Sequence, residues 1–336
     1  MKTQSLILSI CLFLVGLTAC NSGSVMTRAT GISYEAVVVM DRANWESTAG
    51  EAIKGELYAD IPGLPQSEPA IKITYVTPND FNGLLTYVRN IVIVKVDPSM
   101  FTRTSVNSET NRWANGQIVI NVNTPDAQNL AEFMERNKGA IVHMITKAEM
   151  NRTISQLEKT YSSAVLDNVR SKFGVSLRVP SDMTYTRNAE NFFWASNNAN
   201  RGRTDVIVYS FPYTDKETFT LDYLVAKRDS VLRENLPGAF ENSYMATETR
   251  FGLDYKPITV QGKYCAEIRG LWKMVGDMMG GPFVSHARLD EENNQVIVVE
   301  GFVFAPETNK GNYIRRIEAA LYTLLLPGDS ENPEVK

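Results

Sequence analysis

The chain has 336 residues, of which 43% are hydrophobic and 10% aromatic, and its formal net charge is -4. This composition is sufficient for a buried core, which excludes a disordered chain, and the acidic balance excludes the basic surface of a nucleic-acid-binding protein. A mature length above roughly 300 residues indicates two domains or one elaborate domain.

The amino terminus predicts a cleaved export signal. Lys2 precedes an apolar run at 6–17, which is too short to span a bilayer permanently and has the length of a signal-peptide core. The run leads into Leu-Thr-Ala-Cys, which ends at Cys20 and matches the bacterial lipobox. We therefore expect residues 1–19 to be removed and Cys20 to carry the lipid. The alternative is an ordinary signal peptide with a chance cysteine.

Residues 20–32 are expected to form a flexible tether, because 21–27 is rich in small and polar residues. Acyl chains on Cys20 would hold the mature protein on a membrane without spanning it. Asn21, in place of aspartate, is similar to the second mature residue of lipoproteins released to the outer membrane. The tether also lacks the acidic cluster of surface-exported lipoproteins, which favours a periplasm-facing position and leaves surface exposure as the alternative.

The cysteines and histidines predict neither a disulfide nor a metal site. Cys11 leaves with the signal and Cys20 is lipidated, so Cys265 is alone in the mature chain. His143 and His286 are the two histidines and lie in unrelated contexts, which is too few ligands for structural zinc. We expect no metal and no cofactor.

Residues 33–173 form the first predicted half. Strands are expected from apolar runs or alternation at 34–40, 71–76, 91–96 and 117–122. A helix is expected over 41–58, between the first two strands. A long helical stretch is expected to begin at Thr124-Pro125-Asp126, with Thr124 as N-cap and Pro125 and Asp126 in the first turn. It is interrupted at 137–139 and ends at Gly174 as a C-terminal cap. This stretch is taken as the boundary between the halves.

Residues 174–327 form the second predicted half, followed by a tail at 328–336. Strands are expected at 175–179, around 192–194, and at 205–211, 258–275, 282–289 and 295–304. Helices are expected over 216–234 and from Asn312 to a stop at Pro327-Gly328. The order predicts an α+β fold: two α/β-type halves with mainly antiparallel sheets, a long central helix and a C-terminal covering helix.

Several stretches together resemble one known family. These are the lipobox, the long central helix, and the segments Phe173–Pro180, Asn191–Trp194, Arg269–Trp272 and Gly280–Phe283. They look like a Bacteroidota lipoprotein family catalogued only as a domain of unknown function, over nearly the whole mature chain. The resemblance implies no catalytic residues, because that family supplies none.

The chain contains none of the standard catalytic motifs. There is no Gly-x-Ser-x-Gly, His-Glu-x-x-His, phosphate-binding glycine loop or Cys-x-x-Cys. His143 is interpreted as a polar position on a helix, His286 as a solvent-facing strand residue, and Glu291-Glu292 as a solvated turn. A pair of carboxylates distant in the chain remains an alternative, because sequence alone does not exclude it.

The segment from Trp272 to Gly281 is a candidate partner contact. It combines adaptable methionines, Met278 and Met279, with glycine hinges. The alternative is a strand end whose tryptophan and methionines enter the core.

A second candidate contact combines Phe193 and Trp194 with Arg201 and Arg203 in the following Asn-rich loop. Aromatic faces beside guanidinium and amide donors are suited to a sugar or a peptide. The alternative is that the aromatics pack the sheet and the loop only connects strands.

Asp229-Ser230-Val231 resembles the short O-glycosylation motif of periplasmic Bacteroidota proteins, although Ser230 falls in a predicted helix.

From the anchor, the tether and the missing catalytic motifs we expect a lipid-anchored envelope protein with a non-enzymatic interaction or envelope-maintenance role, and an envelope protein or a glycan as its partner. The alternative is a glycan- or peptidoglycan-binding module, or a hydrolase with dispersed carboxylates.

Overall fold

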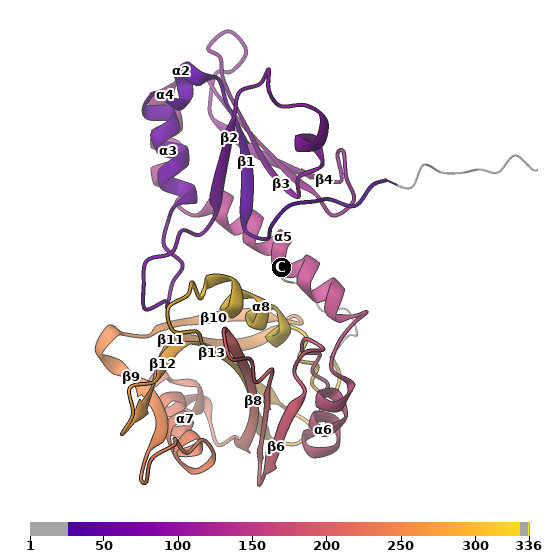
Figure 1. Cartoon of the computed structure of the whole chain (residues 1–336), viewed down its shortest axis with the longest axis vertical. Helices are drawn as coiled ribbons and strands as arrows, with labels where there is room; N and C mark the ends of the chain where they lie inside the picture. Colours follow the sequence, from indigo (N-terminus) through magenta and orange to yellow (C-terminus); the bar gives the residue numbers. More distant parts are fainter. Residues whose placement is uncertain (1–25, 330–334, 336) are drawn as a thin grey trace, which may run out of the picture.

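A computed structural model describes residues 26–329 and residue 335. The chain folds into two halves, each built on one β-sheet, with the N-terminal half above the C-terminal half in Figure 1. Within the described residues, every helix is too short or too polar to cross a bilayer. The predicted signal at 1–19, Cys20 and the first part of the tether lie outside the described residues, so these assignments stay predictions.

The N-terminal sheet has the strand order β2-β1-β3-β5-β4. Its strands are β1 (Glu35–Val39), β2 (Lys72–Val76), β3 (Asn90–Val96), β4 (Ser105–Thr110) and β5 (Ile118–Thr124). β1 is parallel to β2 and β3, β3 is parallel to β5, and β4 is antiparallel to β5. This sheet is therefore mainly parallel rather than mainly antiparallel as expected, because a helical crossover joins β1 to β2.

Helices cover one face of this sheet. They are α2 (Arg42–Trp45), α3 (Thr48–Leu57), α4 (Ala127–Arg136) and α5 (Ala140–Leu157). The single helix expected over 41–58 is two helices, because the Ser47 side chain caps a new start by accepting from the Ala49 N–H. Gly139, with φ 81°, separates α4 from α5 and confirms the predicted interruption.

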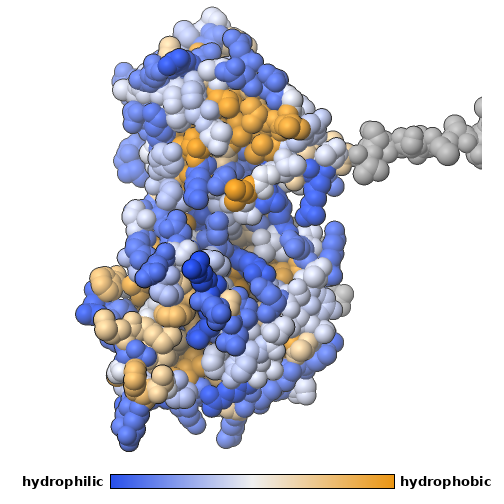
Figure 2. Space-filling model, in the orientation of Figure 1, coloured by the Kyte–Doolittle hydropathy of each residue, from blue (hydrophilic) through white to orange (hydrophobic). Residues whose placement is uncertain are grey.

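The opposite face of the N-terminal sheet carries a smaller apolar cluster around Val37, Ile91 and Val119. The 3-10 helix η1 (Gly83–Tyr87) packs over part of it, and Leu84 in η1 is 84% exposed. Figure 2 shows apolar side chains gathered on the visible surface of the N-terminal half.

The C-terminal sheet is an antiparallel half-barrel with the order β10-β11-β12-β13-β8-β7-β6, and β9 also pairs with β11. Its strands are β6 (Tyr185–Ala189), β7 (Phe192–Ser196), β8 (Arg203–Pro212), β9 (Tyr244–Glu248), β10 (Asp254–Val260), β11 (Lys263–Val275), β12 (Gly280–Asp290) and β13 (Gln295–Phe304). The strand expected at 175–179 is wrong, because this stretch forms only an isolated bridge from Ser176 to Leu325.

Helices cover both faces of the C-terminal sheet. α6 (Ser163–Phe173) and α8 (Gly311–Leu321) pack on one face, and α7 (Leu221–Asn235) packs on the other, with η2 (Lys216–Phe219) and η3 (Thr249–Phe251) in connections. Neighbouring residues of one strand therefore enter opposite cores, as Phe192 and Phe193 do. The α+β class and the C-terminal covering helix are confirmed. α6, which we had placed in the first half, packs on the second sheet and ends at Gly174 with φ 70°.

The two halves share both apolar and polar contacts. Met150 and Ile154 of α5 pack with Tyr322, beyond the end of α8. The Glu68 carboxylate accepts the backbone N–H groups of Lys310 and Gly311 at 2.6 and 2.9 Å, at the start of α8. The apolar contacts hold α5 against the region of α8, and Glu68 ties the loop before β2 to the start of α8 (Figure 1).

Candidate functional site

An open cavity of 760 Å³ lies where the chain enters the N-terminal half. Residues 26–29, the loop at 115–116 and the second half of α5 contribute to its lining. Ser33, Arg89 and Gly116 line the cavity, and each lies just before a strand, β1, β3 and β5 respectively. The cavity is therefore at the amino ends of these three parallel strands. Its volume is in the range of small-molecule sites.

Backbone pairing holds the chain entry in place. Ala29 N–H donates to the Asn115 carbonyl at 2.9 Å, and Asn115 N–H donates to the Thr27 carbonyl at 2.8 Å. Thr30 N–H donates to the Tyr87 carbonyl in the same way. Residues 27–30, which we had assigned to the flexible tether, are thus hydrogen-bonded to the folded body.

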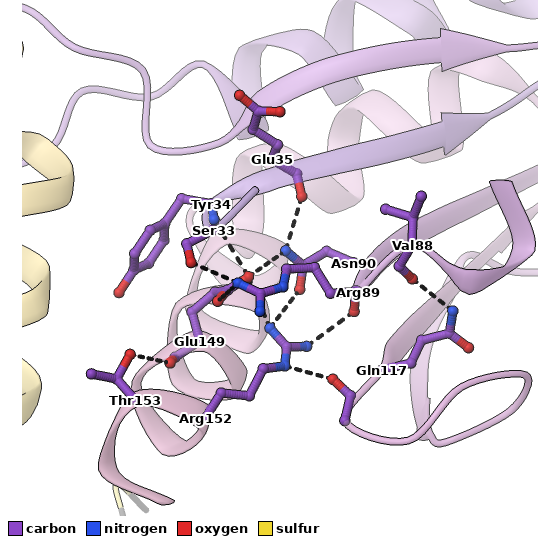
Figure 3. A network of polar contacts seen from close by, with 11 residues as sticks. Ser33, Tyr34, Glu35, Val88, Arg89, Asn90, Gln117, Glu149, Arg152 and Thr153 are labelled. Carbon is purple, nitrogen blue, oxygen red and sulfur yellow. Dashed lines mark hydrogen bonds and ion pairs between the residues drawn. The ribbon is translucent and has the colours of Figure 1, made fainter. Parts of the chain in front are cut away.

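The Glu149 carboxylate is the centre of the cavity floor (Figure 3). It projects from α5, and its side chain is 2% exposed. It accepts from Asn90 Nδ2 at 2.7 Å and from Arg89 Nη1 at 3.1 Å, and Arg152 Nη1 lies 2.8 Å away. The Tyr34 N–H adds a longer bond of 3.4 Å. The buried Glu149 carboxylate is thus surrounded by hydrogen-bond donors from the starts of β1 and β3 and from α5 itself.

Arg152 joins α5 to the starts of the strands (Figure 3). Its Nε donates to the Gly116 carbonyl at 2.6 Å, Nη2 to the Arg89 carbonyl at 3.0 Å, and Nη1 to Asn90 Oδ1 at 3.0 Å. Burial lowers the pKa of the Arg152 guanidinium, the Glu149 charge opposes this, and the Arg89 charge adds to it. An arginine stays cationic under such a shift, so Arg152 serves as a charged structural bridge.

Arg89 is less fully bonded than Arg152. Its Nη1 donates to Ser33 Oγ at 2.6 Å and to Glu149, while its buried Nε has no hydrogen-bond partner within 26–329 or at residue 335. Arg28 and Lys159 add two exposed positive charges at the rim. The lining therefore has four cations against one carboxylate, a formal balance of 4 - 1 = +3. Such a cavity is suited to an anion.

A second polar cluster lies between the C-terminal sheet and α8. His286 is fully buried, with Nε2 3.2 Å from Glu267 Oε2 and its ring against Tyr322. Burial alone would raise the pKa of Glu267, but the hydrogen bond with His286 and the charge of Arg269 outweigh burial and hold this pKa well below its usual range. Our interpretation of His286 as solvent-facing is wrong, because helices cover both faces of this sheet.

The predicted aromatic contact is divided between core and surface. Phe193 is fully buried in the core with α6 and α8, where a ligand does not reach it. Trp194 Nε1 and Arg203 Nε both donate to the buried Asp205 carboxylate at 3.0 Å. Arg201 lies exposed in the loop. The structure therefore does not bring these four side chains together on one surface.

The predicted Met-rich contact is also divided. Trp272 is 1% exposed and donates from Nε1 to the Val303 carbonyl at 3.2 Å, so it is a core residue. Met279 packs partly buried against the same core, whereas Met278 is fully exposed in the β11–β12 turn. Met278 and Met279 line an open groove of 460 Å³ with Phe251, which is 72% exposed. Ser230, elsewhere, is exposed on α7.

Sequence reasoning missed the cavity. The available signals were a polar pair, Arg89-Asn90, at the start of an apolar strand, and Glu149 with Arg152 three positions later on a helix. Each pattern alone is common on solvated surfaces, so neither one indicated that the two pairs meet.

Two family models match the chain. One, described as a domain of unknown function (DUF8532), matches residues 29–158, and the other, described as a domain of unknown function (DUF4837), matches residues 162–323. No curated protein matches. Among solved structures, a crystal structure from Bacteroides thetaiotaomicron VPI-5482 is similar at 15% identity with a TM-score of 0.20, over 45% of this chain and 44% of that one. The chain thus spans less than half of that protein. It consists of two domains of unknown function, and most of the cavity belongs to the first.

Proposed function

We propose that this chain is a lipid-anchored protein of the bacterial cell envelope that binds another molecule rather than catalysing a reaction. The observation that carries the proposal is the short distance between the lipobox and the cavity. Met26, which lines the cavity, is six positions after Cys20. Six extended residues span roughly 20 Å at most, so a lipid on Cys20 keeps the cavity close to the membrane.

The chemistry of the cavity supports binding. A hydrolase that uses two carboxylates needs both acids beside the scissile bond, but Glu149 is the only carboxylate among the lining residues. Its oxygens are occupied by Arg89, Asn90 and Arg152, which disfavours proton transfer. An interaction or envelope-maintenance role is therefore better supported than catalysis by dispersed carboxylates.

A glycan- or peptidoglycan-binding role is the second candidate, and it rests on the groove beside Met278. This groove places the exposed Phe251 ring near the acidic side chains Asp277 and Glu307. Exposed aromatic faces beside polar groups are suited to sugars. Co-sedimentation with purified peptidoglycan tests this role. Binding by the wild type that Phe251→Ala abolishes supports it, and failure of both the wild type and the variant to bind refutes it.

We further propose the outer membrane as the location, on the basis of Asn21, and a position facing the periplasm, because the tether lacks an acidic cluster. Replacing Cys20 with alanine should release a folded protein from the membrane fraction and abolish labelling by palmitate. Cys265→Ala is the matched control, because Cys265 is a buried core thiol and its loss should leave the protein in the membrane. A Cys20→Ala protein that still sediments wholly with membranes would contradict the anchor.

A further inference from the structure

We propose that the cavity beside α5 binds the phosphate group of a small polar molecule or of a lipid headgroup, with Arg89 as the central donor. The inference rests on the proposed binding role and names the chemistry of the ligand. It follows from three observations: the unbalanced charge of the lining, the incomplete bonding of Arg89, and the volume of the cavity.

The charges of the described residues that line the cavity do not balance. On the floor, Glu149 lies 3.1 Å from Arg89 and 2.8 Å from Arg152, so one carboxylate faces two guanidinium groups. At the rim, Arg28 and Lys159 are exposed and form no ion pair among the described residues. Uncompensated cations in a concave site attract an anion, because the low-dielectric walls strengthen their field.

Arg89 has hydrogen-bonding capacity that the protein does not use. Nη1 makes both bonds, to Ser33 and Glu149, and the buried Nε has no partner in the part of the chain that the structure describes. Buried donors without a partner are rare, and a guanidinium presents its donors as a fork that matches phosphate oxygens. A small rotation toward the cavity would let Arg89 donate to an oxyanion.

The size of the cavity indicates more than a bare ion. At 760 Å³ it is much larger than inorganic phosphate, and its walls supply the Thr153 hydroxyl and the Asn115 and Gln156 amides. These groups are suited to the hydroxyl-bearing remainder of a phosphate ester, such as glycerol phosphate. A net charge of +3 also fits the one to two negative charges of a phosphate better than the single charge of a carboxylate.

The phosphate has two possible sources, which share this chemistry. One is a soluble phosphate ester, and the other is the headgroup of an anionic phospholipid. Residues 26–29 form part of the cavity wall, and the lipidated Cys20 would lie within roughly 20 Å of it, which places a lipid headgroup within reach.

Isothermal titration calorimetry with glycerol 3-phosphate tests the soluble source, using the mature lipoprotein in uncharged detergent. Flotation with phosphatidylcholine vesicles, with and without phosphatidylglycerol, tests the lipid source, using the Cys20→Ala protein so that its own anchor does not contribute. We expect saturable binding in at least one arm and weakening with salt.

Variants assign the binding to the cavity. Arg28→Gln with Lys159→Gln removes both rim charges from side chains that form no ion pair with a described residue, and should weaken binding about tenfold or more. Arg103→Gln with Arg187→Gln removes two exposed arginines outside the cavity and should leave binding unchanged. Arg89→Gln should abolish binding, and circular dichroism shows whether it folds. If it does not fold, the rim variant decides.

Binding of glycerol 3-phosphate that the rim variant weakens supports the soluble source. Binding only to vesicles that contain phosphatidylglycerol, again weakened by the rim variant, supports the lipid source. No saturable binding in either arm, or equal effects of the rim and control variants, overturns the proposal. The vesicle arm uses the Cys20→Ala protein, and calorimetry is repeated with that protein, so failure of binding is distinguishable from failure of the proposed anchor.

Discussion

Replacing Arg228 with methionine is expected to destabilise the C-terminal half by about 3–5 kcal/mol. Arg228 projects from α7 into the sheet, where its Nε and Nη2 donate to both Glu300 carboxylate oxygens at 2.8 and 2.7 Å. The two side chains are 1% and 0% exposed. Methionine keeps much of the arginine volume but leaves Glu300 buried without its counter-charge, which is the dominant cost.

The double variant Arg228→Met with Glu300→Leu should recover most of that loss. With both charges removed, neither has to be transferred out of water, and the apolar replacements pack beside Phe283, whose ring centroid lies 3.8 Å from the guanidinium. Thr247 loses a donor from Arg228 but keeps its own bond to Asp229 at 2.6 Å. Buried ion pairs are often replaced by apolar residues without loss, so we expect the double variant within about 2 kcal/mol of the wild type.

Urea denaturation followed by circular dichroism and tryptophan fluorescence measures this cycle, because Trp194 and Trp272 report on the C-terminal half. Each single variant should lose several kcal/mol, and the coupling energy from the cycle should be about 3 kcal/mol or more. A double variant whose loss equals the sum of the two single losses would refute the reasoning, because the cost would then come from packing and not from an unpaired charge.

Three further outcomes are expected. Gly301→Ala should lower the free energy of unfolding in urea by about 1–3 kcal/mol, because a Cβ there would lie 2.0 Å from Ile317 Cγ2 on α8. In the same assay Gly55→Ala in α3 should be neutral or stabilising, because its Cβ would meet no described atom within 4 Å. The pKa of Glu267 is held below its usual value near 4.3. The ionised carboxylate therefore stabilises the folded protein fully above that pH, and this stabilisation is lost as the pH falls through the folded pKa. Stability should therefore fall less for Glu267→Gln than for wild type between about pH 5 and pH 2. Burial raises the pKa of the Cys265 thiol, so a thiol reagent should react with the mature lipoprotein only after denaturation, and a second rapidly reacting thiol would argue against lipidation.

Local backbone chemistry explains which elements the sequence predicted well. The interruption at Gly139 and the end at Gly174 depend on glycine at positive φ, a signal that is readable within a few residues. The expected N-cap at Thr124 is wrong, because Thr124 ends β5 and the Asp126 side chain caps α4 by accepting from the Asn129 N–H. β4 was missed because Ser105–Thr110 is a polar strand at the edge of the sheet, so its sequence lacks the alternation of apolar and polar residues that a half-buried strand shows. The segment at 175–179 has the opposite property: it alternates as a strand does, with Val175, Leu177 and Val179 buried, but it forms only one isolated bridge.

The cavity depends on contacts that no local pattern encodes. Glu149 meets Arg89 across 60 positions of sequence and Asn90 across 59. On the helix itself, Glu149 and Arg152 read as an ordinary i, i+3 pair, which stabilises a solvated surface in most helices. Only the packing of α5 beneath the starts of three strands turns this pair into the floor of a cavity.

The position of the cavity follows from the same packing. Ligands of parallel sheets usually bind at the carboxyl ends of the strands, whereas α5 crosses the amino ends here and supplies Arg152 to the carbonyls of Arg89 and Gly116. The helix that closes this edge of the sheet therefore also carries Glu149, the centre of the floor. One turn further along, α5 leaves the N-terminal sheet, and Ile154 packs beside Tyr322 in the second domain. The cavity floor and the contact between the two domains are thus parts of a single continuous helix, so a shift of α5 at one of them moves the other.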